Sequence, residues 1–365
     1  MIYILTRYGY RSLLKDLLLN RKICMEYQKL GKSSLYVSRL GLGCMGMSEF
    51  YGSSNDDMSV EIIKTAISKG INFFDTADVY GFGHNEKLIG GVIANHPKRD
   101  DLVIATKCGI VRDKNDSRKR SIDNSYDYII KCCDNSIERL NTSIDLFYLH
   151  RVDDTSIFES MKAMSLLLSQ RKIKAVGLSE VRMKTIEEAN AILRDLTDNE
   201  HGISAVQTEY SIFSRNVEQN GVLNFCNENS ISFVAYSPLS RGLLTSQLKD
   251  INQLEKQDSR NYLPRFVGNN FKNNKNIVET ILVPIAYKYS CTVSQLCLAW
   301  LFSKSKNIFP IPGTRRLSYL LENIKAVNIM LSDKDIIFID KSMANFVIHG
   351  ERYPKEDMII YGFDE

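Results

Sequence analysis

The sequence predicts a single α/β domain with the closed (β/α)8 fold of the TIM barrel, and three observations support this. Strand-like apolar runs alternate with amphipathic helix-like segments from residue 25 onward, which is typical of parallel strands joined by crossover helices. Eight such pairs within about 300 residues exceed the roughly five or six strands of a usual open doubly wound sheet. No GxGxxG motif follows the first strand, which argues against a dinucleotide-binding sheet.

The expected strands are short apolar runs bounded by polar or turn residues. Three of them stop at an ionisable side chain, so we expect the strands to bring charged groups to one end of the barrel. In chain order the strands are Leu40–Cys44, Ile71–Asp75, Leu102–Lys107, Asp145–His150, Lys174–Leu178, Ala205–Gln207, Ser232–Tyr236 and Ile308–Pro312.

Helix-like segments lie between these runs. In the segment Asp57–Lys69, the apolar residues Val60, Ile63 and Ile67 recur at the spacing of three and four that places them on one buried face. The same pattern predicts helices over Tyr126–Leu140, Ile157–Ser169 and Lys184–Leu196.

Two stretches are longer than the alternation requires. Residues 241–291 separate the seventh and eighth strands, and the chain continues past the eighth helix to Glu365. In a barrel, long loops after strands lie over the C-terminal face, where active sites are found. We therefore expect one domain over residues 25–365, in which these loops form lids or pocket walls.

The first 24 residues differ from the rest in composition. Their basic residues suggest an organelle transit peptide, but serine is scarce and no apolar core with a small-residue cleavage site is present. The segment that opens at Met25 has the character of a natural start. We expect residues 1–24 to be an N-terminal extension, disordered or translated from an upstream start, with no structural role.

Composition is that of an ordinary globular protein, with 44% hydrophobic and 25% charged residues. The net charge of +4 is small and its basic residues are scattered, so a nucleic-acid partner is not expected. No apolar run of about 18 residues predicts a membrane span. The eight cysteines show no CxxC spacing or disulfide framework, which favours reduced thiols in the cytoplasm. Oligomeric state is open, and a monomer is compatible with the sequence.

Asp75, Lys107 and His150 end three of the expected strands, and Tyr80 follows the first of them by five residues. The phenol of Tyr has a pKa of about 10, so a neighbouring ammonium is needed to favour its anion. Asp75 can keep Lys107 charged, and His150 can donate a hydrogen bond to a developing oxyanion. Each residue alone could be a cap, a solvated strand end or a core group, but together they predict a proton donor facing a carbonyl group.

The loops after the seventh and eighth strands predict a site for a phosphorylated ligand. They read SPLSRG at 237–242 and IPGTRR at 311–316, and loops at these places are the usual phosphate site of this barrel. Arg315 and Arg316 can hold a phosphate by forked hydrogen bonds. Two solvated arginines are the alternative, but cations in the first turn of a helix oppose its dipole, which favours an anionic partner.

The chain resembles aldo-keto reductases from about Met25 almost to its C-terminus, and it is most similar to the auxin-induced-protein-like and pyridoxal-reductase-like group. The motifs that carry the resemblance are GLGCMGMSEFYG (41–52), NFFDTADVYGFGHNEKLIG (72–90), VIATKCG (103–109), DLFYLHRVD (145–153), IKAVGLSE (173–180), AVQTEYSIFSR (205–215), VAYSPLSRGLL (234–244), LPRF (263–266), IPGTRR with LLEN (311–323) and GERYP (350–354).

The resemblance implies reduction of an aldehyde or ketone by NADPH, with Tyr80 as general acid beside Asp75, Lys107 and His150. It assigns the nicotinamide carboxamide to Ser179, Glu180 and Gln207 and the nicotinamide platform to Tyr236. Pyrophosphate contacts fall on Ser237, Pro238, Leu239, Arg241 and Gly242, and the 2′-phosphate end falls on Gly313, Thr314, Arg315, Arg316, Glu322 and Asn323. The arginines favour NADPH over NADH.

Two positions depart from the family pattern. Many relatives have Asn where this chain has Glu180, and a carboxylate can accept from the carboxamide but cannot donate to it. Tyr319 stands where many relatives have a long polar residue against the adenine, and it could stack there.

The substrate side of the site is less defined. Met45 and Tyr51 are expected to line the substrate pocket, and residues 241–275 to close it. The basic loop at 112–120 could attract an anionic substrate, although such charge runs are more often solvated. Pyridoxal is a candidate by resemblance only.

Two other classes of function have weaker support. The family resemblance also extends to nucleotide-sensing regulatory subunits with a reductase fold, such as the β subunits of potassium channels. A metal-dependent barrel hydrolase needs a cluster of His and carboxylate ligands at the strand ends, and His84, His96, His201 and His349 do not supply one, so no metal is expected.

Overall fold

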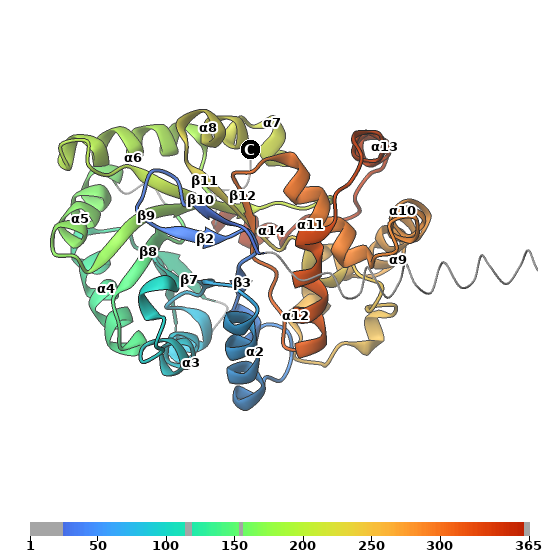
Figure 1. The fold of residues 1–365 in the computed structure, drawn as a ribbon, viewed down its shortest axis with the longest axis horizontal. Coiled ribbons are helices and arrows are strands. Elements are labelled where there is room, and N and C mark those ends of the chain that lie inside the picture. Colours follow the sequence, from blue (N-terminus) through green and yellow to red (C-terminus); the bar gives the residue numbers. More distant parts are fainter. Residues whose placement is uncertain (1–24, 114–118, 153–155, 361–365) are drawn as a thin grey trace, which may run out of the picture.

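The computed structural model describes residues 25–113, 119–152 and 156–360. Eight parallel strands form one sheet in which neighbours follow chain order (Figure 1). They are β3 (Leu42–Gly43), β4 (Phe73–Asp75), β5 (Val103–Cys108), β8 (Ile144–Leu149), β9 (Ile173–Ser179), β10 (Ile203–Glu209), β11 (Ser232–Tyr236) and β12 (Ile308–Pro310).

The first and last strands meet, which closes the sheet into a barrel. Gly43 forms a parallel bridge with Gly313, just past β12, and the backbone N–H of Gly41 donates to the carbonyl of Pro310 at 2.9 Å. The approach is close enough to require glycine, because a Cβ at Gly313 would lie 2.9 Å from the carbonyl oxygen of Gly43. The predicted (β/α)8 fold is confirmed.

Helices cover the outside of the barrel (Figure 1). The predicted bounds of α4 and α5 are those observed, and the eight predicted strands are present with ends displaced by no more than two residues. These displacements arise because ladder hydrogen bonds, and not side-chain pattern alone, fix where a strand ends. The covering helices are α2 (Asp56–Ser68), α3 (His84–Ile93), α4 (Tyr126–Leu140), α5 (Ile157–Ser169), α6 (Met183–Leu196), α7 (Asn216–Gln219), α8 (Val222–Asn229), α11 (Val293–Lys304) and α12 (Leu317–Ile324).

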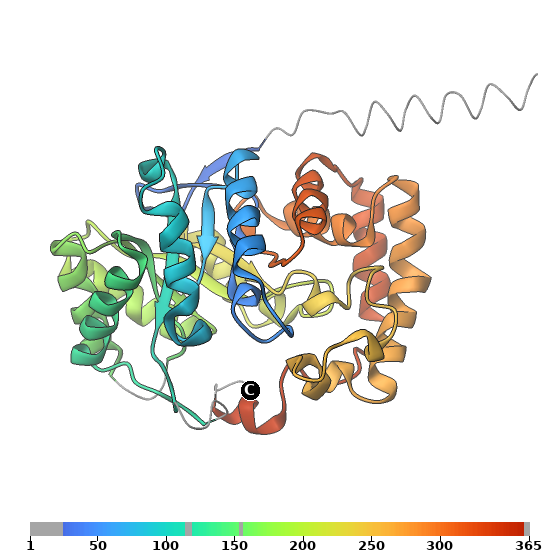
Figure 2. The same ribbon diagram turned by 90° about the horizontal axis from the view of Figure 1, so that it is seen from below.

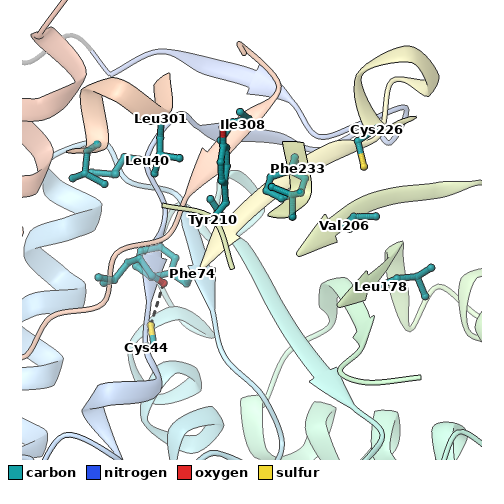
Figure 3. Close-up of a cluster of buried hydrophobic side chains, with 14 of the residues drawn as sticks. Leu40, Cys44, Phe74, Leu178, Val206, Tyr210, Cys226, Phe233, Leu301 and Ile308 are labelled. Atoms are coloured by element: carbon teal, nitrogen blue, oxygen red, sulfur yellow. Dashed lines mark hydrogen bonds between the residues drawn. The ribbon is translucent and has the colours of Figure 1, made fainter. Parts of the chain in front are cut away.

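The apolar side chains form two buried layers because successive residues of a strand face opposite sides of the sheet. Phe74 packs outward in the layer between strands and helices, part of which Figure 3 shows together with Phe233 and Ile308. Its neighbour Phe73 packs inside the barrel. Full burial of one such side chain is worth about 1.5–3 kcal/mol, so these layers supply the main driving force for folding.

A short hairpin covers the N-terminal end of the barrel. It consists of β1 (Tyr27–Lys29) and β2 (Tyr36–Ser38), and its Leu30 belongs to the interior layer. The backbone N–H of Gly31 donates to Oγ of Ser232, the first residue of β11, at 2.7 Å. Ligand access is therefore left to the opposite, C-terminal end.

Further segments gather at the C-terminal end, as Figure 2 shows for the chain around residue 260 and for the C-terminal helix. The segments outside the regular alternation are β6 (Ile110–Arg112), β7 (Arg120–Ile122), α9 (Asn269–Ile277), the π-helical turn Val278–Leu282, α10 (Val283–Lys288), α13 (Asp333–Ala344) and α14 (Lys355–Ile360). The short 3-10 turns are Met45–Met47, Tyr80–Gly83, Arg99–Asp101, Ser240–Gly242, Ile251–Gln253, Ser259–Tyr262, Pro264–Phe266 and Lys325–Asn328.

Three expectations concern features that the fold addresses only in part. The extension 1–24 lies outside the described residues. Within the residues that are described, no single helix is long and apolar enough to cross a membrane. Among these residues, only the pair Asn269–Lys288 and Val293–Lys304, bent by 80° at the break between them, is long and apolar enough when taken together. The seven cysteines from Cys44 to Cys297 are free thiols.

Candidate active site

The ends of β4 and β5 hold a buried ion pair. Asp75 ends β4, and Nζ of Lys107, on β5, lies 2.6 Å from its Oδ1. The same ammonium donates to the carbonyl oxygen of Thr76 at 2.7 Å, and Nε2 of Gln207 donates to the other carboxylate oxygen at 2.7 Å. Burial raises the pKa of Asp75 and lowers the pKa of Lys107, and their mutual attraction opposes both shifts. Thr76 and Gln207 thus hold the two members of the pair in place.

Tyr80 is brought back over the strand ends by a tight turn after β4. Gly81 and Phe82 have positive φ values of 57° and 54°, which reverse the chain directly after the tyrosine. The ring of Tyr80 meets the ring of His150 edge to face at 5.8 Å between centroids, and Nζ of Lys107 lies 5.3 Å from the Tyr80 centroid. The structure therefore brings all four predicted catalytic residues together.

The phenol of Tyr80 keeps its proton in this setting. Burial raises its pKa well above the usual value, and the charge of Asp75 adds to the effect. The sequence led us to expect that Lys107 would lower this pKa, and that expectation is not met. Burial of the phenol is the larger cause, and Asp75, whose carboxylate lies 2.6 Å from the ammonium of Lys107, offsets the charge of that lysine. Tyr80 is a proton donor rather than a ready phenolate.

His150 follows β8 directly and is neutral. Its backbone N–H donates to the carbonyl oxygen of Cys108 at 2.7 Å, which fixes it beside the end of β5. Burial lowers its pKa well below the usual value, and the positive charges of Arg151 and Lys107 lower it further. Among the described residues, its Nδ1 is buried without a hydrogen-bond partner. A neutral imidazole has one donor and one acceptor nitrogen, so it can donate to a ligand oxygen.

A single cavity of about 660 Å³ opens above these residues. Asp75, Tyr80 and His150 line it, while Lys107 lies fully buried beneath. Apart from Glu180, the residues expected to contact the cofactor or to wall the substrate pocket also line it, namely Met45, Tyr51, Ser179, Gln207, Tyr236, Ser237, Pro238, Leu239, Arg241, Gly242, Gly313, Thr314, Arg315, Arg316, Glu322 and Asn323.

Arg315 and Arg316, which line the cavity, are held by contacts within the chain itself. Arg315 donates to the carbonyl oxygen of Ser53. Arg316 donates to the hydroxyl of Tyr319 at 3.1 Å, and its guanidinium lies 5.3 Å from the centre of that ring. Tyr319 lines the same cavity, so a stacking role for it near the adenine is compatible with its position.

Glu180 does not line the cavity, in contrast to Ser179 and Gln207. Its Oε1 accepts from the backbone N–H of Glu209 at 2.9 Å and from Nη1 of Arg352 at 3.1 Å, and its Oε2 accepts from Nη2 of Arg352 at 3.2 Å. Both oxygens are therefore engaged within the protein, which leaves Glu180 a poor match for the carboxamide contact that the resemblance implied.

Several cavity residues had no signal of their own in the sequence. From the long insertion, Glu255 accepts from the backbone and hydroxyl of Ser53, both at 3.0 Å, and Arg260 lies 5.1 Å from the ring centre of Tyr51. The insertion thus crosses to the loop at residues 50–53, as expected of a pocket wall. Tyr353 also lines the cavity, and only the GERYP motif pointed to it.

The basic loop at 112–120 is described only in part, because residues 114–118 lie outside the described ranges. Its flanking residues Arg112 and Arg120, on β6 and β7, line the cavity. Nη1 of Arg112 contacts both oxygens of Glu49, at 2.9 and 2.8 Å, so this cation is already paired.

Comparison with known proteins places the chain in a family. Residues 39–344 match the model of the Aldo/keto reductase family. "Aldo-keto reductase yakc [NADP(+)]" of Schizosaccharomyces pombe is 37% identical over 331 residues, which cover 90% of this chain and 94% of that protein. "Probable aldo-keto reductase 1" of Glycine max is 38% identical over 328 residues, which cover 89% and 91% of the two chains.

Solved structures agree with this result. The glycerol dehydrogenase AKR11B4 from Gluconobacter oxydans superposes with a TM-score of 0.76 at 26% identity, covering 91% of this chain and 98% of that one. The thermostable aldo-keto reductase Tm1743 superposes with a TM-score of 0.68 at 30% identity, and the match covers 87% of this chain and 100% of that one. The chain belongs to the aldo/keto reductase family, which confirms the predicted enzyme class. The narrower subgroup stays a prediction.

Proposed function

We propose that this protein reduces an aldehyde or ketone to the alcohol with NADPH, and that Tyr80 supplies the proton. The observation that carries the proposal is a protonated phenol beside a buried ion pair, on the wall of a cavity that two arginines also line. The predicted cofactor is supported by the fission-yeast relative, whose name includes NADP(+).

The cavity residues fit this cofactor. Ser179 and Gln207 offer a hydroxyl and an amide for the carboxamide, and the ring of Tyr236 offers a platform for the nicotinamide. Arg315 and Arg316 provide positive charge for the 2′-phosphate. When bound, NADPH supplies the hydride.

The protein residues handle the proton and the developing charge. The carbonyl carbon gains the hydride, and the carbonyl oxygen gains the proton of Tyr80. His150, held neutral by burial, donates a hydrogen bond to the same oxygen. The resulting phenolate of Tyr80, whose ring centre lies 5.3 Å from the ammonium of Lys107, then regains a proton from solvent.

The test is the substitution Tyr80→Phe in the full chain. It removes the hydroxyl and keeps the ring that packs on His150, so NADPH binding measured by cofactor fluorescence should change little. The rate of NADPH oxidation with an aldehyde should fall by about a hundredfold to ten-thousandfold, the usual contribution of general acid catalysis. A variant that reduces carbonyls at the wild-type rate would refute the role of Tyr80.

The substrate can be identified with the same assay. We suggest a panel of pyridoxal, nitrobenzaldehydes, methylglyoxal and sugar aldehydes with the wild-type protein. Steady NADPH oxidation with any of them supports the enzyme. NADPH binding without turnover on the whole panel would favour the alternative, a nucleotide-sensing regulatory subunit, because such a protein keeps the cofactor site.

A further inference from the structure

Glu180 has an unusual backbone conformation for its residue type. It follows β9 with a φ of 53°, in the left-handed region that Asn enters more readily than Glu. Its own N–H donates to the carbonyl of Gln207 at 2.9 Å, and its carboxylate accepts from the N–H of Glu209. Such a conformation persists only where surrounding contacts fix it, which indicates that the side chain has a specific partner.

That partner is Arg352, in the segment before α14. The two oxygens of Glu180 face the two terminal nitrogens of the guanidinium at 3.1 and 3.2 Å, and the Glu180 side chain is only 3% exposed. Although burial opposes ionisation, Arg352 and then Arg151 lower the pKa of Glu180, so the carboxylate is charged. A forked, largely buried pair of this kind fixes geometry more strongly than an exposed salt bridge.

The residue after Arg352 reaches the proposed cofactor contacts. The hydroxyl of Tyr353 lies 3.1 Å from the hydroxyl of Tyr236, and its ring centre lies 4.4 Å from the guanidinium carbon of Arg241. Tyr236 is the proposed nicotinamide platform and Arg241 a proposed pyrophosphate contact. One aromatic side chain therefore touches both, from the cavity wall.

The other end of this segment is fixed independently. Asn274, on α9, accepts from the backbone N–H of His349 and donates to its carbonyl, both at 2.9 Å. Gly350 has a φ of 88° and packs so tightly that a Cβ there would lie 2.6 Å from the backbone of Pro264. The segment 349–353 is thus held at the insertion by one end and at the end of β9 by the other.

We propose that the Glu180–Arg352 pair positions Tyr353 against Tyr236 and Arg241, and that Glu180 serves this purpose instead of binding the nicotinamide carboxamide. The proposal rests on the function proposed above. Arg352 and Glu180 are positioning residues, whereas Tyr353 contacts the cofactor site. The carboxamide is then left to Ser179 and Gln207.

The test compares Arg352→Met, Tyr353→Leu and the double variant in the full chain. NADPH affinity is measured by fluorescence titration, and kcat and KM by NADPH oxidation. Each single variant should weaken NADPH binding by about tenfold, in line with the loss of charged or well-packed contacts. The double variant should be no weaker than Tyr353→Leu, because Arg352 acts through Tyr353. Lys355→Met, which removes an exposed cation at the start of α14, is the control and should leave NADPH affinity unchanged.

A second substitution separates the two roles of Glu180. If Glu180 bound the carboxamide, Glu180→Asn would preserve or improve NADPH affinity, since Asn is what many relatives carry; that result would overturn the proposal. The positioning role predicts the same loss as Arg352→Met. Additive losses in the double variant, or wild-type affinity in Arg352→Met, would also overturn it. If Tyr353→Leu does not fold, Tyr353→Phe takes its place in the test. It removes only the hydroxyl, so its loss of NADPH affinity should be smaller than about tenfold.

These outcomes differ from a failure of the proposed function. A wild-type protein that binds NADPH but turns over no carbonyl would refute the reductase, while the titrations would still decide the role of the pair. A wild-type protein that binds no NADPH would refute both the proposed function and the positioning role.

Discussion

Removing the charge of Asp75 tests the buried ion pair most directly. Asp75→Asn keeps the shape of the side chain but offers one acceptor oxygen where two donors, Nζ of Lys107 and Nε2 of Gln207, now approach the carboxylate. Gln207 can turn its amide to repair its own contact. The main remaining effect is therefore that the fully buried ammonium of Lys107 loses its counter-charge.

The size of the effect follows from the burial. Breaking a buried ion pair by removing one partner costs about 3–5 kcal/mol. An unfolding entropy of about 2 cal/mol/K per residue gives roughly 0.8 kcal/mol/K for this chain of 365 residues, so the melting temperature should fall by about 4–6 °C. Burial already lowers the pKa of Lys107, and without Asp75 it should fall further, so that the ammonium is lost at lower pH.

The assay is thermal unfolding followed by circular dichroism, together with the pH profile of carbonyl reduction. Asp57→Asn, at an exposed position of α2, is the matched control and should unfold close to the wild-type temperature. Activity of Asp75→Asn should decline toward high pH sooner than that of the wild type, as Lys107 loses its proton. A melting temperature within about 1 °C of the wild type, with an unchanged pH profile, would refute the role given to this pair.

Two further predictions concern the cofactor and pH. Replacing both Arg315 and Arg316 by Ala should weaken the binding of NADPH by at least about tenfold and leave the binding of NADH almost unchanged, as measured by fluorescence titration. Equal losses of affinity for the two cofactors would refute the assignment of these arginines to the 2′-phosphate. Tyr80 has a raised pKa and His150 a lowered one, so Tyr80 keeps its proton up to about pH 10 and His150 stays neutral at and above about pH 6.5. The rate constant of carbonyl reduction at saturating NADPH, measured by stopped flow and plotted against pH, should therefore show no break near about pH 6.5. A break there that disappears in His150→Gln would contradict a neutral imidazole.

The pattern of the sequence was enough to predict the eight strands of the barrel and four of its covering helices. The bounds of α4 and α5 follow from their apolar spacing, because a helix face repeats within a few residues. Ionisable groups at the ends of apolar runs pointed to Asp75, Lys107 and His150, since parallel strands in a barrel carry their C-terminal ends to one face. The catalytic cluster could therefore be predicted from local sequence patterns, and the family resemblance assigned the roles of its residues.

Contacts between distant segments were decided by the tertiary structure alone. Glu180 and Arg352 are 172 positions apart and Tyr236 and Tyr353 are 117 apart, and no local pattern specifies which of many charged or aromatic residues will pair. The protonation of Tyr80 also depends on how deeply the ring is buried and on the offset of Lys107 by Asp75. Sequence pattern acts over one or two turns of chain, whereas partner choice and pKa depend on which segments barrel closure brings within a few ångströms of one another.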